Sequence, residues 1–355
     1  MKNSPPQTPL STPALEQALH AVADKVRKND LALGRECRNY DFGTNNQPFL
    51  HLFHAPFSLC SHKVRSVFFE HQIPFTSYPL SLFPKNGVHS ENYYPEFLNL
   101  RLLGRSPDSM DEGLSESFSG ASSVTQEGFD PCVVPVLVDL KNSQVVTDSL
   151  AICLYLDKHY GNSRLISDDS NRASEVESQL RIVDETPHVA LLYGANPDRD
   201  ERPAPMQQML VGIHAKKVSE LLYQLSELGS EDRHLEPAYQ AKIAKEKSAG
   251  EFVADPEKMR VVISRTREIL LQLEKDIAQG DDWILPGPLS MADLFWAISL
   301  YRLQWLGYSH FWNSDDSLPK VAAFASRAFE LDCVRKAVIE WPGMPPSQHT
   351  QSLLN

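Results

Sequence analysis

The sequence predicts a small mixed α/β domain followed by an all-helical domain, and three observations support this fold class. Two strand patterns flank one helical pattern over residues 49–82, and two further strands precede a helix over residues 133–161. After residue 163, helical patterns follow one another and no strand pattern is convincing. Strand–helix–strand followed by strand–strand–helix indicates one mixed sheet covered by helices. We therefore expect the two domains to occupy residues 49–161 and 162–341.

Composition and charge restrict the class of protein. The chain has 355 residues, of which 42% are hydrophobic and 23% charged, values typical of a globular protein with room for two domains. A formal net charge of −12 argues against binding to nucleic acid or to an anionic membrane, because both require a basic face. No apolar run approaches the roughly 20 residues of a membrane helix, and the N-terminus lacks a secretory segment. We expect a cytoplasmic protein without nucleic-acid or membrane partners.

Residues 1–48 form an N-terminal extension to the α/β domain. Residues 1–12 are rich in Pro and Ser and are expected to be disordered. Thr12-Pro13 then offers a helix N-cap followed by proline at the first helical position. Apolar residues recur at helical spacing after it, namely Leu15, Leu19, Val22 and Val26. We expect a short helix packed on the body of the protein and, at the other end of the chain, a tail over residues 342–355.

The α/β domain contains alternating strand and helix patterns. Strands are predicted at 49–54, 74–82, 133–139 and 144–148, and helices at 61–72 and 149–161. Gly161 ends the last of these helices.

The stretch over residues 84–131 is too long for an ordinary connection within such a domain. Much of it is rich in Ser, Gly and acidic residues. A loop of this length is either functional or disordered. We interpret it as an insertion, and either a wall of the site or a solvated loop is consistent with its composition.

The second domain consists of successive helical patterns. They cover 170–193, 205–228, 235–252, 256–279, 290–312 and 317–340. Asp255-Pro256 is an N-cap and first-position pair, and Ser290 with Asp293 forms a capping box. We therefore interpret Asp293 as a helix cap and not as a catalytic acid. The predicted fold is an all-helical bundle.

The cysteines are distributed in a way that favours neither disulfides nor metal binding. There are five, at Cys37, Cys60, Cys132, Cys153 and Cys333. An odd number without close pairs is unsuited to a disulfide framework, and none shows metal-ligand spacing. We expect reduced thiols and no metal.

Cys60 alone has surroundings that suggest chemistry. It lies at the start of a predicted helix, where unpaired N–H groups and the helix dipole favour a thiolate and lower the pKa. Lys63 and Arg65 add positive charge, and Ser58 and Ser61 can donate hydrogen bonds to a thiolate. The alternative is an ordinary buried cysteine. Because Lys63 stands where a dithiol motif has its second cysteine, a disulfide made at Cys60 requires an external thiol, for which glutathione is the abundant candidate.

Two further elements are suited to glutathione. Val134-Pro135 precedes an apolar strand, and a cis proline there would expose the Val134 backbone to an extended peptide, although an ordinary trans proline is the alternative. Asp148-Ser149 opens a helix, where the N-terminus and the hydroxyl suit a carboxylate and Asp148 suits an ammonium. Asp-Ser is also a common N-cap. The ordered combination is more specific than either element.

The motifs S-x-C-S-x-K-V-R, V-V-P-x-L-V, D-S-x-A-I-C-L-Y-L and S-x-A-D, in this order, resemble the cytosolic glutathione transferases. Those proteins have a thioredoxin-like N-terminal domain and a helical C-terminal domain. The S-x-C-S element is similar to the zeta class and to the glutathione-dependent hydroquinone dehalogenases. From about residue 49 the chain resembles the dehalogenases in longer stretches, namely FDPCVVPVLVD, TPHVALLYGANPD, GIHAKKV, ADLFWAISLYRLQWLGYSHFW and WPGMPPS.

The resemblance implies a role for each matching residue. Ser58 corresponds to the serine that stabilises the glutathione thiolate, and Cys60 to the catalytic cysteine. The glutathione-binding elements correspond to Val134, Pro135, Asp148 and Ser149. Many transferases have Glu or Gln where this chain has the shorter Asp148. The resemblance further implies glutathione as co-substrate and a homodimer as a possible assembly.

The resemblance also implies reductive dehalogenation of a chlorinated hydroquinone. Glutathione thiolate would displace chloride, Cys60 would attack the resulting thioether, and a second glutathione would resolve the mixed disulfide. Other glutathione chemistry on aromatic substrates, either β-aryl ether cleavage or zeta-type isomerisation, is an alternative. A glutathione-binding module without turnover is another.

An aromatic substrate needs an apolar wall beside the thiol. The candidates lie in the helical domain, at Tyr193, Trp296, Tyr301, Trp305 and Tyr308, although aromatic residues at helical spacing are usually core. His188 and His214 are candidates for polarising a phenolic oxygen, with a structural role as the alternative.

Overall fold

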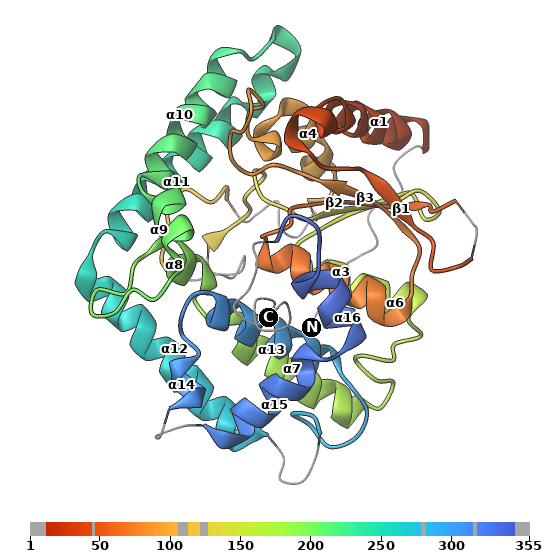
Figure 1. The fold of residues 1–355 in the computed structure, drawn as a ribbon. Coiled ribbons are helices and arrows are strands. Elements are labelled where there is room, and N and C mark those ends of the chain that lie inside the picture. The colour runs from red at the N-terminus through yellow and green to blue at the C-terminus, as the bar shows by residue number, and fades with distance from the viewer. Residues whose placement is uncertain are drawn as a thin grey trace.

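The computed structural model shows one five-stranded sheet next to a larger array of helices (Figure 1). It describes residues 12–44, 47–105, 113–120, 127–277, 282–314 and 318–344. The expected disorder of residues 1–11, the side chain of Thr12 and most of the predicted C-terminal tail lie outside the described residues. In the part of the chain that the structure describes, no helix combines the length and apolarity needed to cross a bilayer.

The sheet has the strand order β1-β3-β2-β4-β5. Strands β2 (Leu50–His54) and β3 (Phe75–Pro79) are parallel, and helix α3 (Leu59–His71) connects them. Strand β4 (Val136–Asp139) pairs antiparallel with β2, and β5 (Gln144–Thr147) pairs antiparallel with β4. The chain then enters α6 (Ser149–Tyr160). This arrangement confirms the predicted thioredoxin-like domain.

The sheet is covered on both faces, so it has two hydrophobic cores. Figure 1 shows α3 and α6 on one face and α1 (Thr12–Lys28) and α4 (Pro95–Leu103) on the other. Alternating strand residues divide between the two cores: Leu50 and Leu52 face the helical domain, and Phe53 faces α1. This is the two-sided burial that the apolar strand patterns predict.

The N-terminal extension contributes more to the sheet than the sequence indicated. The predicted helix is present as α1, and its apolar stripe, Leu15, Leu19, Val22 and Val26, is buried. After the short α2 (Asp30–Leu33), β1 (Arg38–Tyr40) pairs antiparallel with β3 at the sheet edge. A strand of three residues, two of them exposed and polar, leaves no apolar alternation to recognise.

The stretch 84–131 is not the continuous loop that its composition suggested. It contains a 3-10 turn, η1 (Glu91–Tyr93), and α4, which begins at Pro95 and packs against β5 and α1. Phe97, Leu98 and Leu100 of α4 are fully buried. The Ser- and Gly-rich sequence that follows obscured this short helix, and residues 106–112 and 121–126 lie outside the described residues.

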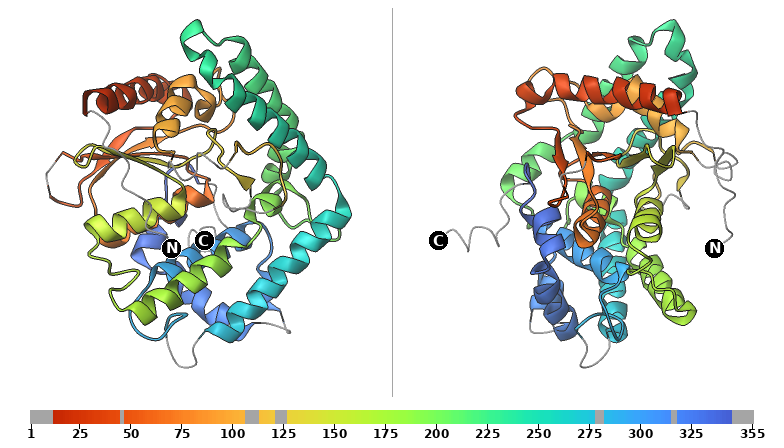
Figure 2. Two further views of the ribbon diagram at one scale, coloured as in Figure 1. Left: turned by 180° about the vertical axis from the view of Figure 1, so that it is seen from behind. Right: turned by 90° about the vertical axis from the view of Figure 1, so that its right-hand side faces the viewer.

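The second domain contains helices and no strand among its described residues, as predicted. Its helices are α7 (Ser170–Asp184), α8 (His188–Tyr193), α9 (Ala204–Leu210), α10 (Ile213–Ser226), α11 (Glu236–Val253), α12 (Pro256–Asp276), α13 (Met291–Trp305), α14 (His310–Asn313), α15 (Pro319–Phe329) and α16 (Asp332–Val334), with η3 (Ser230–Leu235) and a π-helical turn, η4 (Arg335–Ile339). Figure 2 shows α10, α11 and α12 running along one side of the molecule.

Four of the predicted helices, 170–193, 205–228, 290–312 and 317–340, are divided into shorter ones, and two of the breaks set the starts of helices that line the site. The segment 170–193 breaks at Pro187, which lacks the N–H that a continuous helix needs. The segment 205–228 breaks at Gly212, whose φ of 63° is left-handed. Both breaks matter for the site because α8 and α10 begin at them.

Candidate active site

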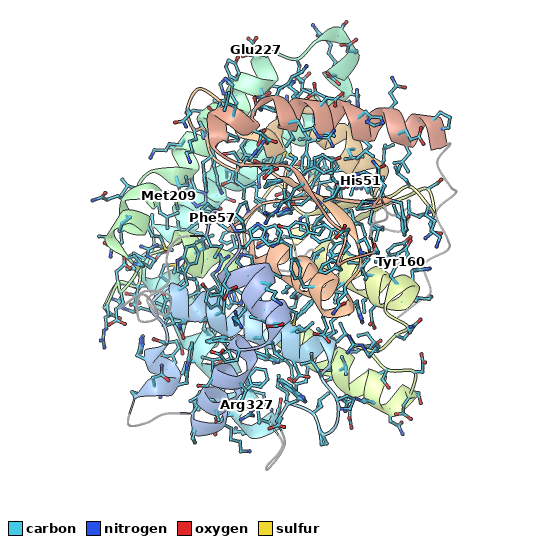
Figure 3. All side chains as sticks on the ribbon, turned by 45° about the vertical axis from the view of Figure 1, so that its right-hand side comes forward. His51, Phe57, Tyr160, Met209, Glu227 and Arg327 are labelled. Atoms are coloured by element: carbon cyan, nitrogen blue, oxygen red, sulfur yellow. The ribbon has the colours of Figure 1, made fainter. Side chains whose placement is uncertain are left out.

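A cavity of about 290 Å³ lies between the two domains. On the sheet side it is lined by the start of α3, the loop before β4 and the start of α6. On the helical side it is lined by residues of α8, α10, α11 and α13. It includes the six predicted catalytic and glutathione-binding residues, Ser58, Cys60, Val134, Pro135, Asp148 and Ser149. Phe57, labelled in Figure 3, belongs to the same wall.

Cys60 is half-buried and is the second residue of α3, which begins two residues before the predicted start at residue 61. Ser58 is the N-cap, and its Oγ accepts a hydrogen bond from the Ser61 N–H at 3.3 Å. The hydroxyl proton of Ser58 is not used in this bond. Ser61 instead is fully buried, and its Oγ accepts from the Ala55 N–H at 3.1 Å. Ser61 therefore supports the loop and does not line the cavity.

The pKa of the Cys60 thiol is raised, in contrast to the lowered value that its position at the helix start predicts. Burial raises the pKa most, Lys63 and a hydrogen bond from Ser149 lower it, and Asp148 and Asp184 raise it. The sequence shows the helix and the lysine but does not show the desolvation. Arg65 is not among the main causes of this shift.

Lys63 connects Cys60 to the helical domain. Its Nζ lies 2.7 Å from Asp184 Oδ1 of α7 and 4.4 Å from the centroid of the Phe295 ring. Burial lowers the pKa of Lys63, but Asp184 and Cys60 together raise it by more than burial lowers it. The net shift is therefore upward, and the side chain is charged at neutral pH. Asp184 thus fixes a positive charge beside the thiol.

Val134-Pro135 is a cis peptide bond, the form that the glutathione hypothesis required. Arg101 of α4 donates from Nη1 to the Pro135 carbonyl at 3.0 Å. Among the described residues, no hydrogen bond uses the N–H or C=O of Val134. The Val134 backbone is therefore available at the cavity wall.

Asp148 serves both as helix cap and as cavity residue. Its Oδ1 accepts from the N–H groups of Leu150 and Ala151 at 2.9 and 3.1 Å, with a φ of 71°. Within the described chain no hydrogen bond uses Oδ2. Burial raises the pKa of Asp148 above its ordinary value of 3.8. The adjacent Ser149 is 7% exposed and donates toward Cys60.

The predicted aromatic wall is only partly present. Tyr193 and His214 line the cavity, with ring centroids 5.0 Å apart. The other candidates, Trp296, Tyr301, Trp305 and Tyr308, do not line it. Because α13 is apolar all round and buried on nearly every side, helical spacing did not show which of its residues meet the cavity.

Each of these other aromatic residues has a packing partner elsewhere. Tyr301 packs edge-on against Phe329. The rings of Tyr308 and Phe311 are 5.7 Å apart. Trp305 stacks at 6.5 Å on Phe57, which itself lines the cavity, and Trp296 donates to Gln179. The capping box at Ser290 and Asp293 is present, as predicted.

The sequence did not predict the charged cluster that lines the helical side. Lys242 Nζ lies 2.7 Å from Asp130 and 2.9 Å from Glu246, and Glu246 also binds His214 Nδ1 at 2.8 Å. Lys217 lies 3.3 Å from Glu246. Burial raises the pKa of Asp130, but Lys242 and Lys245 lower it to about 2. An i, i+4 pair within α11, Lys242 and Glu246, was the one signal of this cluster in the sequence.

The sequence reasoning also missed Arg302 and Cys132, both of which line the cavity. Arg302 is the single cation in the apolar stretch LFWAISLYRLQWL, and this isolation was a usable signal. Cys132 is fully buried, and burial together with Asp130 raises its pKa well above the ordinary value. It is therefore a protonated thiol at neutral pH.

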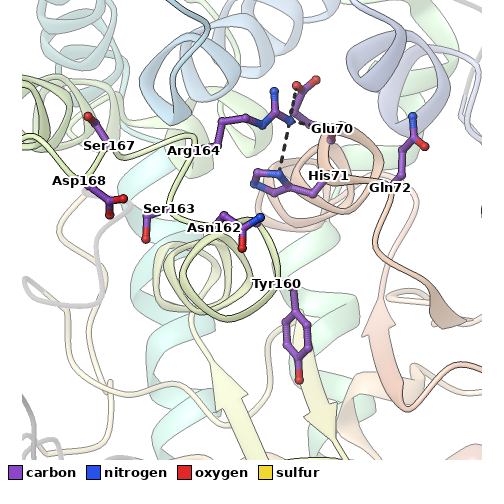
Figure 4. Close-up of a pocket in the computed structure, with 10 residues that line it drawn as sticks. Glu70, His71, Gln72, Tyr160, Asn162, Ser163, Arg164, Ser167 and Asp168 are labelled. Carbon is purple, nitrogen blue, oxygen red and sulfur yellow. Dashed lines mark hydrogen bonds and ion pairs between the residues drawn. The ribbon is translucent and has the colours of Figure 1, made fainter.

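A second hollow, of about 560 Å³, lies at the C-terminal ends of α3 and α6 (Figure 4). Its lining is mostly polar, and Arg164 donates to Glu70 across it at 2.8 Å. His71 binds Asp157 at 2.8 Å nearby. None of the predicted site residues lies there, since Cys60 is at the other end of α3. We place the candidate active site in the first cavity.

Comparison with known proteins agrees with this geometry. Residues 57–159 match the family model described as the glutathione S-transferase N-terminal domain. The chain is 44% identical over 311 residues to a 2,5-dichlorohydroquinone reductive dechlorinase of Sphingobium indicum strain B90A, covering 87% of this chain and 88% of the relative. A second protein of that name, from strain UT26, is 43% identical with the same coverage.

Comparison with solved structures finds a similar fold at lower sequence identity. The crystal structure of the β-etherase LigF from Sphingobium sp. strain SYK-6 superposes with a TM-score of 0.50 at 14% identity, covering 81% of this chain and 98% of that one. This likeness concerns the fold alone. The match to the family model and the identity to the two dechlorinases show that the chain belongs to the glutathione S-transferase superfamily.

Proposed function

We propose that this protein catalyses the glutathione-dependent reductive dehalogenation of a chlorinated hydroquinone. The observation that carries the proposal is that Ser58, Cys60 and the cis Val134-Pro135 element meet Asp148 and Ser149 at one cavity. The identity to two reductive dechlorinases supports the choice of substrate class.

The sheet-side wall of the cavity holds glutathione in this proposal. The free backbone groups of Val134 pair with the extended peptide. The helix N-terminus and the Ser149 hydroxyl hold the γ-glutamyl carboxylate, while Asp148 Oδ2 accepts from its ammonium. The Ser58 hydroxyl donates to the glutathione thiolate. The described hydrogen bonds leave the Val134 backbone, Asp148 Oδ2 and the Ser58 hydroxyl proton available. The Ser149 hydroxyl would turn from Cys60 to the carboxylate when glutathione binds.

The first step is displacement of chloride. Glutathione thiolate attacks the ring carbon that bears chlorine in an activated, ketonic form of the hydroquinone. A carbon–sulfur bond forms, the carbon–chlorine bond breaks, and chloride leaves with the electron pair. The product is a glutathionyl-hydroquinone.

The second step uses Cys60. Its thiolate attacks the thioether sulfur, so that a disulfide bond forms and the carbon–sulfur bond breaks with its electron pair passing to the ring, which takes up a proton. A second glutathione thiolate then attacks the mixed disulfide and releases Cys60 and oxidised glutathione. Two glutathiones together lose two electrons, and the ring carbon gains them. Cys60 must ionise only in this step, after the thioether has formed beside Lys63.

Stoichiometry with 2,5-dichlorohydroquinone tests the proposal. Chloride, oxidised glutathione and the ring product are measured anaerobically in one reaction. We expect one oxidised glutathione for each chloride. Chloride with a stable thioether would instead indicate simple transfer, and no chloride from a protein that binds glutathione would favour ether cleavage or isomerisation.

A further inference from the structure

Buried polar atoms without partners are concentrated at the cavity. Among the described residues, eight buried side-chain nitrogen or oxygen atoms have no hydrogen-bond partner. Five of their residues line the cavity, namely Asn92, Thr186, His188, His214 and Arg302. A buried polar atom without a partner costs about 1–3 kcal/mol, so such a concentration indicates a polar ligand.

Arg302 is the most costly member of this group. Its side chain is 2% exposed, its Nη2 donates to the Phe57 carbonyl, and its Nε has no partner within the described chain. No carboxylate of the described residues forms an ion pair with it. Burial lowers its pKa to about 10, so the guanidinium is charged at neutral pH. An unpaired buried charge is rare unless it binds an anion.

Other buried cations show what a satisfied environment looks like here. Arg65 is also fully buried without a carboxylate, but it donates to the carbonyls of Ala337, Ala55 and Pro56 and contacts His54. Lys63, in the cavity, is paired with Asp184. Arg302 has fewer polar partners among the described residues: one carbonyl accepts from its guanidinium, which also lies 4.8 Å from the centroid of the Trp305 ring.

His188 provides a second unpartnered atom in the same region. Its Nε2 lies 2.8 Å from Ser299 Oγ, and Ser299 is one turn before Arg302 on α13. Its Nδ1 is buried and has no partner among the described residues. Burial and then Arg302 lower the pKa of His188 well below its ordinary value, so the imidazole is neutral at pH 7. The pair therefore offers one positive charge and one neutral polar atom.

We propose that Arg302, with His188 beside it, binds a ring oxygen of the hydroquinone in its anionic, phenolate form. This inference rests on the proposed function and adds the group that recognises the ring. Arg302 lies close enough to Cys60 and Tyr193 for their electrostatic effects to reach it. The ring oxygen would thus be held on the helical side of the cavity, while the ring carbon that bears the chlorine or the sulfur faces the thiols.

A cation that binds the phenolate oxygen would assist the second step of the proposed reaction, in which Cys60 attacks the thioether. When Cys60 attacks the thioether sulfur of the ketonic ring, the electron pair of the broken carbon–sulfur bond moves through the ring to the carbonyl oxygen. The departing group is therefore a phenolate, which takes its proton on release. A fixed cation at that oxygen stabilises the charge where it develops.

Binding of 2,5-dichlorophenol to the wild-type protein without glutathione tests this inference. This probe has one ring oxygen, and ultraviolet difference spectra distinguish its phenol from its phenolate. Because Arg302 favours the anion, we expect the bound probe to ionise at least about one pH unit below the free probe, which corresponds to a tenfold preference for phenolate. The ether 2,5-dichloroanisole, which cannot ionise, is the control ligand.

Two variants locate the effect. In Arg302→Gln we expect the shift to disappear and the affinity for 2,5-dichlorophenol to fall about tenfold at a pH where the free probe is ionised, with the affinities for 2,5-dichloroanisole and glutathione unchanged. Arg302→Lys, which keeps the charge, retains most of the shift. Circular dichroism melting checks that each variant folds.

Several results would overturn the inference. One is a bound probe that ionises like the free one, or no binding of the probe by the wild type. Another is an Arg302→Gln variant that loses phenol and anisole binding equally, because that pattern indicates a structural role through the Phe57 carbonyl. A third is an Arg302→Gln variant in which the ionisation of Cys60 changes and probe binding does not. Chloride release with no probe shift would refute the phenolate site and leave the proposed function intact, and a probe shift without chloride release would do the reverse.

Discussion

The two walls of the cavity differ in the kind of group they present. The sheet wall presents the hydroxyls of Ser58 and Ser149, the Cys60 thiol and the free backbone of Val134. The helical wall presents buried charges and imidazoles from α8, α10, α11 and α13. Backbone groups and hydroxyls at helix starts suit a peptide co-substrate with two charged ends. Buried charges suit recognition of one particular ring, because leaving them unpaired penalises every wrong ligand.

The largest effect is expected from the sheet wall, in Cys60→Ser. We predict that formation of oxidised glutathione falls by roughly 10³-fold or more, because the thioether has no nucleophile to attack its sulfur. Chloride release continues and a glutathionyl-hydroquinone accumulates, which mass spectrometry of the products detects. Cys132→Ala is the matched control, because Cys132 lines the same cavity as a protonated thiol. If Cys60→Ser still yields oxidised glutathione, or if Cys132→Ala stalls instead, the assigned role is wrong.

Ser58→Ala should have the next largest effect. Loss of one donor to a thiolate costs about 10²-fold in a typical site, so the rate of chloride release should fall by about that factor. Stability should fall by about 1 kcal/mol because the N-cap of α3 is lost. Asp169→Ala removes the N-cap of α7, whose Oδ1 accepts from the Arg172 N–H, and controls for stability alone. Equal activity losses in the two variants would mean that Ser58 acts only as a cap.

On the helical wall, Asp130→Asn tests whether the charges hold one another in place. The pKa of Asp130 is about 2 in the folded chain, against an ordinary value of 3.8. A carboxyl whose folded pKa is depressed stabilises the fold above pH 4 and loses that contribution as the pH falls toward 2. The shift corresponds to about 2 kcal/mol.

Urea unfolding of the wild type and of Asp130→Asn between pH 2 and 6 measures this contribution. We expect the difference in unfolding free energy to be largest at pH 6 and to shrink toward pH 2. If the unfolding free energies of the two proteins instead differ by the same amount at every pH, Lys242 and Lys245 do not depend on the Asp130 carboxylate for their placement.

The same comparison shows which parts of the site the sequence predicts. Sheet-wall residues were found because their positions are fixed locally: Ser58 and Asp148 are helix caps, and Pro135 directly precedes a strand. The helical wall depends on which face of each helix meets the cavity, and α13 carries no polar stripe to show it. The aromatic candidates Tyr301 and Tyr308 do not line the cavity, whereas Arg302, which does, was overlooked.

Some sequence predictions failed because burial is not visible in the sequence, and others because the local pattern was too short or obscured. The sign of the Cys60 pKa shift reversed because desolvation, which requires the tertiary structure, outweighs Lys63 and Ser149. Strand β1 and helix α4 were missed because the first is three residues long and the second lies in a Ser- and Gly-rich stretch. The fold class was predictable because strand and helix patterns are strong on both sides of these gaps.

The smallest predicted effect concerns the ionisation of Cys60 where the two walls meet. Because burial holds its pKa above the ordinary value of 9.0, alkylation of the glutathione-free protein by iodoacetamide should rise steadily through pH 7 to 9 without a plateau.

Asp184→Asn should lower the pKa of the Cys60 thiol, because it removes a negative charge that raises that pKa. The same substitution also removes the partner, 2.7 Å away, that holds Lys63 in place, which opposes the decrease. Lys63→Met removes the positive charge outright and should raise the pKa further. If alkylation instead reaches its plateau below pH 7, the thiol is ionised before any thioether forms, and the sheet wall then contributes a ready thiolate instead of one that appears only in the second step. Rates are measured with Cys60→Ser as the blank, which subtracts the reaction of the other thiols.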